Sequence, residues 1–182
     1  MPHLPTADLV ARCRALEWLL CDVDGVLTDG RLYYGAGNQP LVAFDIKDGL
    51  GMKLAQRAGL KVGVLSGRSS PGVQARATEV GLDAVVLGRE DKGAAFDEFL
   101  ASQRVLPERV AYVGDDLLDL AVLGRCGLAL APADAVAEVR GAVHRVLARP
   151  GGRGAVREAV ELVLRARGQW PPSAASPAEP SS

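Results

Sequence analysis

Short apolar segments alternate with amphipathic segments along most of the chain. The apolar segments predict strands at residues 18–23, 60–66, 83–88, 109–114, 127–131 and 142–147. The segments between them predict helices at residues 6–17, 48–58, 71–80, 91–103 and 116–123, a short helix from about Asp134, and a last helix after a glycine-rich turn at 149–154. Strands that are apolar on both faces and alternate with helices indicate a parallel sheet covered on two sides. The pattern therefore predicts a three-layer, Rossmann-like α/β fold.

One interval departs from this alternation. Short strand patterns at residues 31–34 and 41–44 flank the sequence GAGNQP, which is typical of a hairpin loop. Asp48 is expected to cap the helix that follows and ends near Ala58. We expect one domain over residues 1–168, with a β-hairpin insertion at 31–44. The remainder, 169–182, is rich in Pro, Ser and Ala and is expected to be a disordered tail.

Composition limits the classes of partner and compartment. The 182 residues carry a formal net charge of −1, which gives no electrostatic reason to expect binding to nucleic acid or to a membrane. No window approaches the roughly 18 consecutive apolar residues of a membrane span, and the first residues do not resemble a signal peptide, so a cytoplasmic location is expected. The three cysteines are too scattered to predict a disulfide framework or a zinc site.

The first strand ends in an unusual pair of carboxylates, Asp22 and Asp24, followed by Gly25. Side chains two residues apart on an extended chain point to the same face, so these carboxylates would repel each other unless a cation or a shared proton intervened. Asp-Gly is also common in turns, so this motif alone leaves a purely structural interpretation open.

Polar side chains follow three other predicted strands. Ser66, Gly67 and Arg68 end the second strand, Lys92 comes shortly after the third, and Asp115, Asp116 and Asp119 follow the fourth. Because ligands of parallel α/β sheets bind at the carboxyl ends of strands, we expect these groups to share one site. Converging carboxylates suit Mg²⁺, and a hydroxyl, a lysine and free backbone N–H groups beside Mg²⁺ suit a phosphate group.

These groups predict phosphoryl chemistry. The Asp22 carboxylate could attack phosphorus and form an aspartyl-phosphate. The Asp24 side chain could protonate the leaving oxygen and then take a proton from the hydrolytic water. We expect Mg²⁺ to be held by Asp22, the backbone carbonyl of Asp24, and Asp115.

In this order, DVDGV, Ser66, Lys92 and GDD resemble the haloacid dehalogenase superfamily of phosphotransferases. Further segments, namely DVDGVLTDG, FDIKDGLGMKLAQRAG, SGRSS, GREDK, YVGDDLLDL and GGRGAVRE, resemble the 3-deoxy-D-manno-octulosonate 8-phosphate phosphatase family over residues 18–165. The resemblance implies Mg²⁺-dependent hydrolysis of that sugar phosphate through an aspartyl-phosphate, in lipopolysaccharide precursor synthesis. It also implies a hairpin in place of a cap domain, and a homotetramer in which a neighbouring subunit helps to close each active site.

The resemblance extends to individual positions. It implies that the phosphate is bound by Ser66, Gly67 and Lys92, with Arg68 and Asp48 nearby. It implies that Asp116 and Asp119 orient metal waters or Lys92. It also implies that Arg153 and Arg157 lie near the substrate of the same or a neighbouring subunit, where arginine can pair with a sugar carboxylate. Two departures bear on the substrate: the chain has Leu87 where related sequences often carry glutamine, and APADA is a variant around Asp134.

Other functions remain open at this point. A phosphatase of the same fold could act on a nine-carbon keto-acid sugar phosphate or on another small phosphate. A phospho-accepting receiver domain also places aspartates and a lysine around Mg²⁺, but its phosphorylated aspartate comes in mid-chain, whereas Asp22 is near the start. A scaffold without catalytic activity would not need the complete set of acids.

Overall fold

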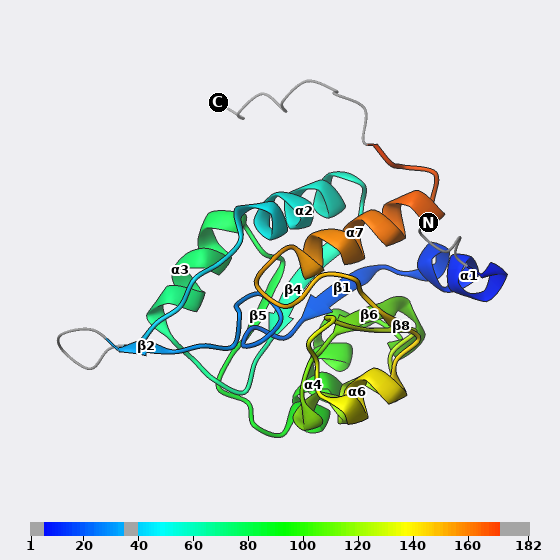
Figure 1. Ribbon diagram of the computed structural model, residues 1–182. Helices are drawn as coiled ribbons and strands as arrows, with labels where there is room; N and C mark the ends of the chain where they lie inside the picture. The colour runs from blue at the N-terminus through cyan, green and yellow to red at the C-terminus, as the bar shows by residue number, and fades with distance from the viewer. Residues whose placement is uncertain (1–5, 35–39, 172–182) are drawn as a thin grey trace, which may run out of the picture.

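The computed structural model describes residues 6–34 and 40–171. Its centre is a six-stranded sheet in the order β5-β4-β1-β6-β7-β8, and every pair of neighbours is parallel (Figure 1). The strands are β1 (Trp18–Cys21), β4 (Lys61–Leu65), β5 (Ala84–Val86), β6 (Val110–Val113), β7 (Leu128–Ala131) and β8 (Arg145–Val146). The predicted parallel α/β sheet is confirmed.

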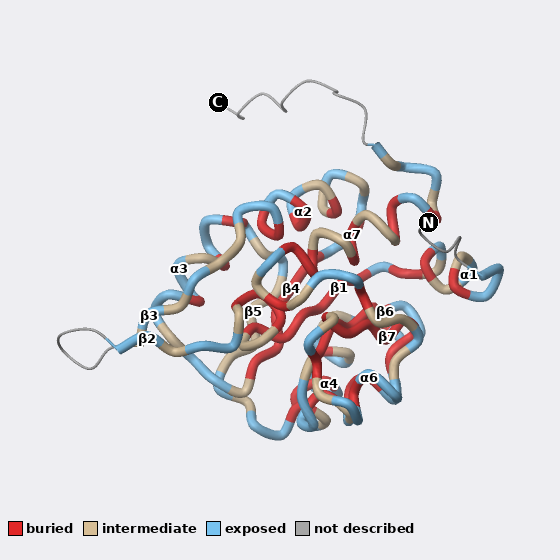
Figure 2. Tube along the Cα trace, in the orientation of Figure 1, coloured by how far each residue is buried: buried red, intermediate tan, exposed pale blue. Residues whose placement is uncertain are grey.

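Helices cover both faces of this sheet. The helices α1 (Ala7–Ala15), α2 (Ile46–Arg57), α3 (Pro71–Val80) and α7 (Ala155–Ala166) pack on one face. The opposite face is covered by α4 (Lys92–Gln103), α5 (Leu120–Leu123) and α6 (Ala137–Ala142). Figure 2 shows the buried strands running between these two layers. The three-layer arrangement matches the prediction.

The strands β1, β6 and β7 are buried along their whole length because successive side chains enter two different cores. In β1, Leu19 and Cys21 belong to the core under α2 and α7, whereas Trp18 and Leu20 belong to the core under α4. The same alternation holds in β6, where Tyr112 enters the α4 core. A strand buried on both faces must be apolar at every position, which explains why the sequence reads as continuous apolar runs.

Parallel pairing brings the ends of the strands to one edge of the sheet. Cys21 of β1 pairs with Val64 of β4 and with Val113 of β6. The residue after β1 continues this pattern, since the N–H of Asp22 donates to the carbonyl of Val113 at 2.9 Å. The segments that follow β1, β4, β5 and β6 therefore open toward a common region.

The hairpin strands are shorter than predicted. The strands β2 (Tyr33–Tyr34) and β3 (Pro40–Leu41) form an antiparallel pair in which Tyr33 lies opposite Leu41. Of the predicted loop, 35–40, Pro40 belongs to β3, and residues 35–39 lie outside the described residues, as does most of the predicted tail, 172–182.

The prediction that Asp48 caps α2 is wrong. Asp45 is the N-cap, and its side chain accepts a 2.7 Å hydrogen bond from the N–H of Lys47. Asp48 lies inside the first turn of α2 and turns toward α7, where it finds other N–H donors. The helix therefore begins two residues earlier than predicted.

Two other helices also differ from the prediction. Residues 116–123 form a 3-10 turn, Leu117–Asp119, before the short helix α5, because the Asp119 side chain turns back to accept hydrogen bonds from the N–H groups of Asp115 and Asp116. The short helix expected from Asp134 begins at Ala137. None of the described helices has the length and hydrophobicity needed to cross a lipid bilayer.

Candidate active site

A buried lysine links two carboxylates at the carboxyl edge of the sheet. The Nζ atom of Lys92 lies 2.9 Å from Oδ2 of Asp22 and 2.6 Å from Oδ1 of Asp119. Lys92 is the first residue of α4, and its side chain is only 3% exposed. A lysine at this end of a helix is disfavoured by the helix dipole, and a buried ammonium group needs paired anions. The carboxylates of Asp22 and Asp119 supply these anions and offset the unfavourable interaction with the helix dipole.

Asp119 is the most completely satisfied of these groups. Its Oδ1 atom accepts from Lys92 and from the hydroxyl of Tyr112, the latter at 2.7 Å. Its Oδ2 atom accepts from the N–H groups of Asp115 and Asp116 at 2.9 and 3.2 Å. The residue is 0% exposed. Since four donors already occupy it, Asp119 is suited to hold Lys92 and the 115–116 backbone in place.

Asp115 has the opposite character. Its Oδ1 atom is the buried side-chain oxygen that lacks any hydrogen-bond partner among the described residues. A carboxylate oxygen in such a position is costly unless a cation or another ligand satisfies it. Oxygens of Asp22, Asp115 and Asp119 all lie within 4.8 Å of one another. Because the Asp119 oxygens are occupied, Asp22 and Asp115 are the side chains that fit a hard divalent cation such as Mg²⁺.

The electrostatics of this cluster favour a bound cation. Burial raises the pKa of Asp115 to about 7, and the nearby carboxylates of Asp22 and Asp119 add to the rise. Burial also raises the pKa of Asp22 to about 6, with a further increase from Asp119 and an opposing effect from Lys92. Burial alone would lower the pKa of Lys92, but the two ion pairs outweigh it and the net shift is upward. Lys92 therefore remains charged. Its single positive charge does not balance the three carboxylates of Asp22, Asp115 and Asp119.

The other members of the first two motifs lie around this cluster. Oδ2 of Asp24 is 3.9 Å from Nε of Arg68, and both side chains are partly exposed. Ser66 is buried, and its Oγ atom accepts a 3.2 Å hydrogen bond from the N–H of Arg68. A Cβ atom at Gly67 would have no neighbour closer than 3.9 Å, so this backbone is open to a ligand.

Asp48 is brought to the N-terminus of α7. It is 1% exposed, and it accepts hydrogen bonds from the N–H groups of Gly154 at 3.2 Å and of Arg157 at 2.7 Å. Burial raises the pKa of Asp48 to about 6, while these two hydrogen bonds oppose the rise. The contacts of Asp48 among the described residues are thus with protein backbone.

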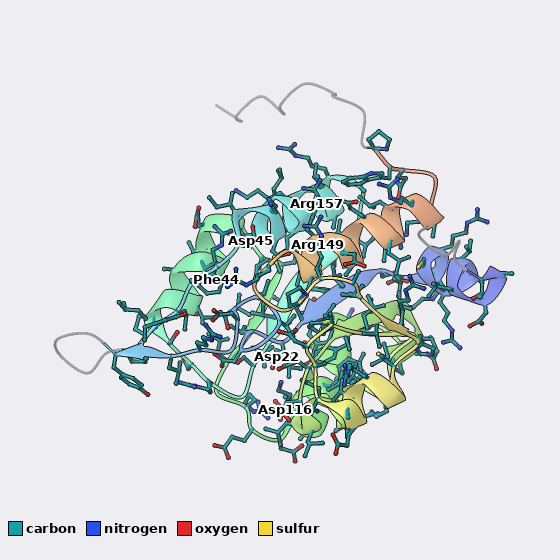
Figure 3. All side chains as sticks on the ribbon, viewed as in Figure 1. Asp22, Phe44, Asp45, Asp116, Arg149 and Arg157 are labelled. Carbon is teal, nitrogen blue, oxygen red and sulfur yellow. The ribbon has the colours of Figure 1, made fainter. Side chains whose placement is uncertain are left out.

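The two arginines of the last motif lie in different environments. The guanidinium of Arg157 donates to Glu161 at 2.8 Å and lies 5.0 Å from the ring centre of Trp170. Figure 3 shows Arg157 at the level of α2 and α7, separated from Asp22 and Asp116. Arg153 is exposed in the turn before α7. The substrate contacts of both arginines stay predictions.

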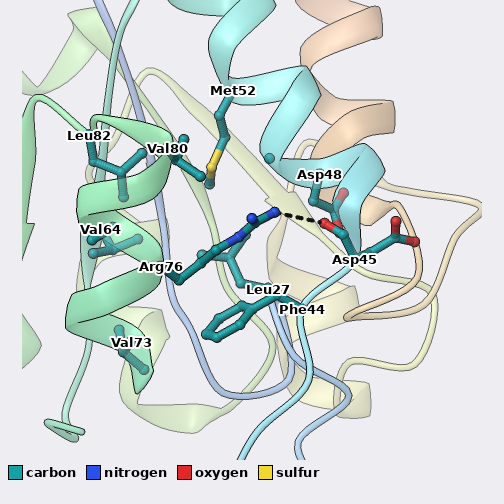
Figure 4. A pocket seen from close by; sticks show the side chains of 12 residues that line it. Leu27, Phe44, Asp45, Asp48, Met52, Val64, Val73, Arg76, Val80 and Leu82 are labelled. Atoms are coloured by element: carbon teal, nitrogen blue, oxygen red, sulfur yellow. Dashed lines mark hydrogen bonds between the residues drawn. The ribbon is translucent and has the colours of Figure 1, made fainter. Parts of the chain in front are cut away.

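Two small cavities adjoin these elements. One, of about 10 Å³, is lined by Asp24 and Arg68 together with Leu32, Pro40 and Val42 from either side of the hairpin. The other, of about 20 Å³, lies between α2 and α3, where the Arg76 guanidinium reaches the carbonyl of Asp45 (Figure 4). Each has room for at most one water, so neither encloses a sugar.

Sequence reasoning missed two contributors to this region. Tyr112 donates to Asp119 at 2.7 Å, and Asp134 accepts from the N–H of Gly151 at 2.9 Å. Only Tyr112 offered a signal: it is the one polar-tipped side chain in the strand VAYV, just before the carboxylates, and a buried tyrosine hydroxyl needs a partner.

Comparison with known proteins gives a consistent relationship. No protein-family model matches the chain. The chain is 40% identical over 154 residues to the 3-deoxy-D-manno-octulosonate 8-phosphate phosphatase of Haemophilus influenzae, which covers 85% of this chain and 86% of that protein. The chain belongs to the 3-deoxy-D-manno-octulosonate 8-phosphate phosphatase family. The family resemblance inferred from the motifs is confirmed.

Solved structures of this phosphatase family have the same fold. The enzyme from Yersinia pestis superimposes with a TM-score of 0.87 at 38% identity, over 90% of this chain and 88% of that one. The enzyme from Moraxella catarrhalis, solved in complex with a magnesium ion, a phosphate ion and a KDO molecule, superimposes with a TM-score of 0.87 at 30% identity, over 91% and 95% of the two chains. Membership of a phosphatase family agrees with the cluster of acids and lysine at the carboxyl edge of the sheet.

Proposed function

We propose that the protein hydrolyses 3-deoxy-D-manno-octulosonate 8-phosphate to 3-deoxy-D-manno-octulosonate and phosphate, in lipopolysaccharide precursor synthesis. The observation that carries this proposal is the pairing of Lys92 with Asp22 at 2.9 Å beside an oxygen of Asp115 that has no hydrogen-bond partner within residues 6–34 and 40–171. This arrangement combines a carboxylate that can attack, a fixed positive charge for a phosphate, and a ligand that needs a cation. Family membership supports the identity of the sugar phosphate.

In the first step, an oxygen of the Asp22 carboxylate attacks the phosphorus atom and the ester P–O bond breaks. Asp24 gives its proton to the departing sugar oxygen. Asp24 is suited to this role because it is partly exposed and lies two residues beyond Asp22. The products of this step are the free sugar and an aspartyl-phosphate on Asp22.

In the second step, water attacks the phosphorus atom of the aspartyl-phosphate. The Asp24 carboxylate takes a proton from this water, the bond between Asp22 and phosphorus breaks, and phosphate is released. Asp24 thereby returns to its protonated form and Asp22 to its carboxylate form. The two aspartates end the cycle as they began it.

The remaining residues bind and neutralise. Mg²⁺, held by Asp22, Asp115 and the backbone carbonyl of Asp24, would neutralise charge on the phosphate and allow an anionic nucleophile to approach it. We assign phosphate binding to Ser66, Gly67 and Lys92, with Arg68 at the sugar side. Asp116 and Asp119 would position the lysine and the metal waters, and Arg153 and Arg157 would meet the sugar carboxylate of this or a neighbouring subunit.

We assign assembly into a homotetramer to the surface of the hairpin. Tyr33, Tyr34 and Leu41 are 47%, 66% and 63% exposed, and together they form an apolar group on two short strands. An apolar surface of this kind is typical of a protein interface. We also assign a cytoplasmic location. Light scattering at micromolar concentration should give a tetramer mass, and a monomer mass would contradict the assembly.

The proposed reaction is tested by incubating the purified protein with Mg²⁺ and a panel of sugar phosphates while released phosphate is measured. The panel contains 3-deoxy-D-manno-octulosonate 8-phosphate, a nine-carbon keto-acid sugar phosphate and ordinary hexose phosphates. We expect at least about tenfold higher kcat/KM for the eight-carbon substrate, equivalent to about 1.4 kcal/mol.

Two outcomes would change the proposal. Higher activity on the nine-carbon compound would reassign the substrate within the same chemistry. Absence of phosphate release from every compound, with Asp22→Asn behaving like the wild type, would refute the proposed phosphatase activity. It would favour a phospho-accepting receiver domain or a scaffold without catalytic activity.

A further inference from the structure

The backbone of the loop after β1 lies directly on the metal-site carboxylate. A Cβ atom at Gly25 would lie 2.0 Å from Oδ2 of Asp115, and Gly25 has a φ angle of +83°. No residue other than glycine fits there, because any side chain would displace Asp115. The position of this loop and the position of Asp115 are therefore coupled.

A turn from the far end of the chain covers the other side of Gly25. A Cβ atom at Gly151 would lie 1.8 Å from the carbonyl oxygen of Gly25, so the two backbones are in contact. The N–H of Gly152 donates a 2.9 Å hydrogen bond to the carbonyl of Val26. Gly25 is thus held between the turn at 150–154 on one side and Asp115 on the other.

Asp48 holds this turn in place. Gly154 is the N-cap residue of α7 and has no side chain with which to cap the helix. Asp48 supplies the cap from α2, since its carboxylate accepts from the N–H groups of Gly154 and Arg157 at 3.2 and 2.7 Å. A carboxylate at a helix N-terminus also interacts favourably with the helix dipole. Asp134 adds a second attachment through the N–H of Gly151.

The part of α2 that carries Asp48 is itself anchored. Arg76 of α3 donates to the carbonyl of Asp45 at 3.3 Å (Figure 4). A Cβ atom at Gly49 would lie 2.2 Å from Nη2 of Arg76, so the guanidinium fills the space above the helix backbone. The first turn of α2 is fixed by α3 on one side, which allows Asp48 to act as a rigid support for α7 on the other.

We propose that Asp48 is a positioning residue for the metal site, which acts by capping α7, pressing the 150–154 turn onto Gly25, and so fixing the loop after β1 over Asp115. This inference rests on the proposed Mg²⁺ site. It replaces the predicted role of Asp48 in substrate binding with a role in positioning the loop over Asp115. Substitution of a residue that orients metal ligands from outside the coordination shell typically lowers metal affinity by about 10-fold to 100-fold.

The test compares Asp48→Asn with Thr6→Ala. The substituted asparagine keeps the volume but directs an N–H₂ group toward an N–H donor. Thr6 caps α1 through the N–H of Leu9 at 3.3 Å, so its loss removes a helix cap outside the acidic cluster. We expect Asp48→Asn to weaken calorimetrically measured Mg²⁺ binding by about tenfold and to speed hydrogen exchange at the N–H of Gly152 in metal-free protein. Thr6→Ala should leave both unchanged.

Wild-type Mg²⁺ affinity and wild-type protection of Gly152 in Asp48→Asn would overturn the inference. If Asp48→Asn does not fold, Asp134→Ala releases the same turn through Gly151. We expect it to shift both measurements in the same direction, and no shift would also overturn the inference. Neither readout uses the sugar phosphate, so a protein that hydrolyses none of the compounds but shows these effects would refute the proposed function alone.

Discussion

The hydroxyl of Tyr112 donates a 2.7 Å hydrogen bond to Oδ1 of Asp119, and both residues are 0% exposed. The same oxygen accepts from Lys92. Because a buried charge loses stabilisation with each donor removed, Tyr112→Phe should lower the free energy of unfolding by about 1.5–3 kcal/mol, measured by urea denaturation. It should also reduce kcat, since Lys92 would be held less firmly.

Tyr33→Phe is the matched control for this substitution. The Tyr33 hydroxyl donates to Asp29 at 3.4 Å, and the residue is 47% exposed. Loss of this exposed contact should change the free energy of unfolding by less than about 0.5 kcal/mol. Equal effects of the two substitutions would show that the hydroxyl of Tyr112 does not support the buried cluster.

Asp24 and Asp115 should separate turnover from metal binding. Asp24→Asn removes the proton carrier but keeps the backbone carbonyl, so we expect normal Mg²⁺ affinity and a fall in kcat of about 100-fold or more. Asp115→Asn should instead weaken Mg²⁺ binding, because it removes the negative charge from a carboxylate whose Oδ1 has no hydrogen-bond partner in the described part of the chain. Calorimetry and steady-state kinetics on both variants check this.

The surface variant Asp97→Asn, which loses an exposed ion pair with Arg125, should behave like wild type in both measurements. If Asp24→Asn lost Mg²⁺ instead, its side chain would be a ligand and the assigned role would be wrong.

The raised pKa values of Asp22 and Asp115, about 6 and about 7, predict a pH dependence for the metal-free protein. Both lie above the value of about 3.9 expected for an unfolded aspartate. The folded state therefore binds protons more tightly than the unfolded state, and the stability that this contributes is present below about pH 4 and is lost as the pH rises through 7.

Binding of Mg²⁺ requires the ionised carboxylates, so it should release protons near about pH 6. Calorimetry in two buffers of different ionisation enthalpy measures this release directly. Identical heats in the two buffers would show that the carboxylates are already ionised. Asp115→Asn serves as the control, since it should reduce the number of protons released.

His144 predicts a second pH dependence of opposite sign. Its Nδ1 atom accepts a 2.8 Å hydrogen bond from the N–H of Ala129 in β7, so the imidazole must be neutral. Burial lowers the pKa of His144, and Arg12 lowers it further, while Asp8 opposes this. A lowered pKa means that the contribution to stability is present above about pH 6.5 and is lost as the pH falls through the folded value.

The chain has 2 histidines, so an NMR titration can follow each imidazole separately. One should titrate below the usual value of about 6.5. Its signals should disappear in His144→Gln, in which an amide oxygen can still accept from Ala129. Two histidines with ordinary pKa values would contradict the hydrogen bond to β7.

The order of strands and helices could be read from the sequence because the central strands are buried on both faces and the long helices on one. The grouping of Asp22, Lys92 and Asp115 followed from the rule that parallel strands present their carboxyl ends at one edge. Both inferences use only local pattern and topology, which the order of residues along the chain determines.

The role of Asp48 could not be read in this way. It caps a helix through Gly154, which lies 106 residues further along the chain, and this contact exists only once α2 packs against α7. The direction of Arg157 toward Trp170, and of Tyr112 toward Asp119, depends on tertiary packing in the same way. The local sequence pattern predicted that Asp48 caps α2, the helix that contains it. Tertiary packing instead makes Asp48 the cap of α7.

The turn that lies on Gly25 is synthesised after every side chain of the acidic cluster. A nascent chain that ends before residue 150 already contains Asp22, Lys92 and Asp115, yet the carbonyl of Gly25 is still open to water. Domains form from the N-terminal end while the ribosome is still adding residues. The loop over Asp115 is therefore covered only when the turn at 150–154 docks, which makes this contact a late step relative to the synthesis of the acidic cluster.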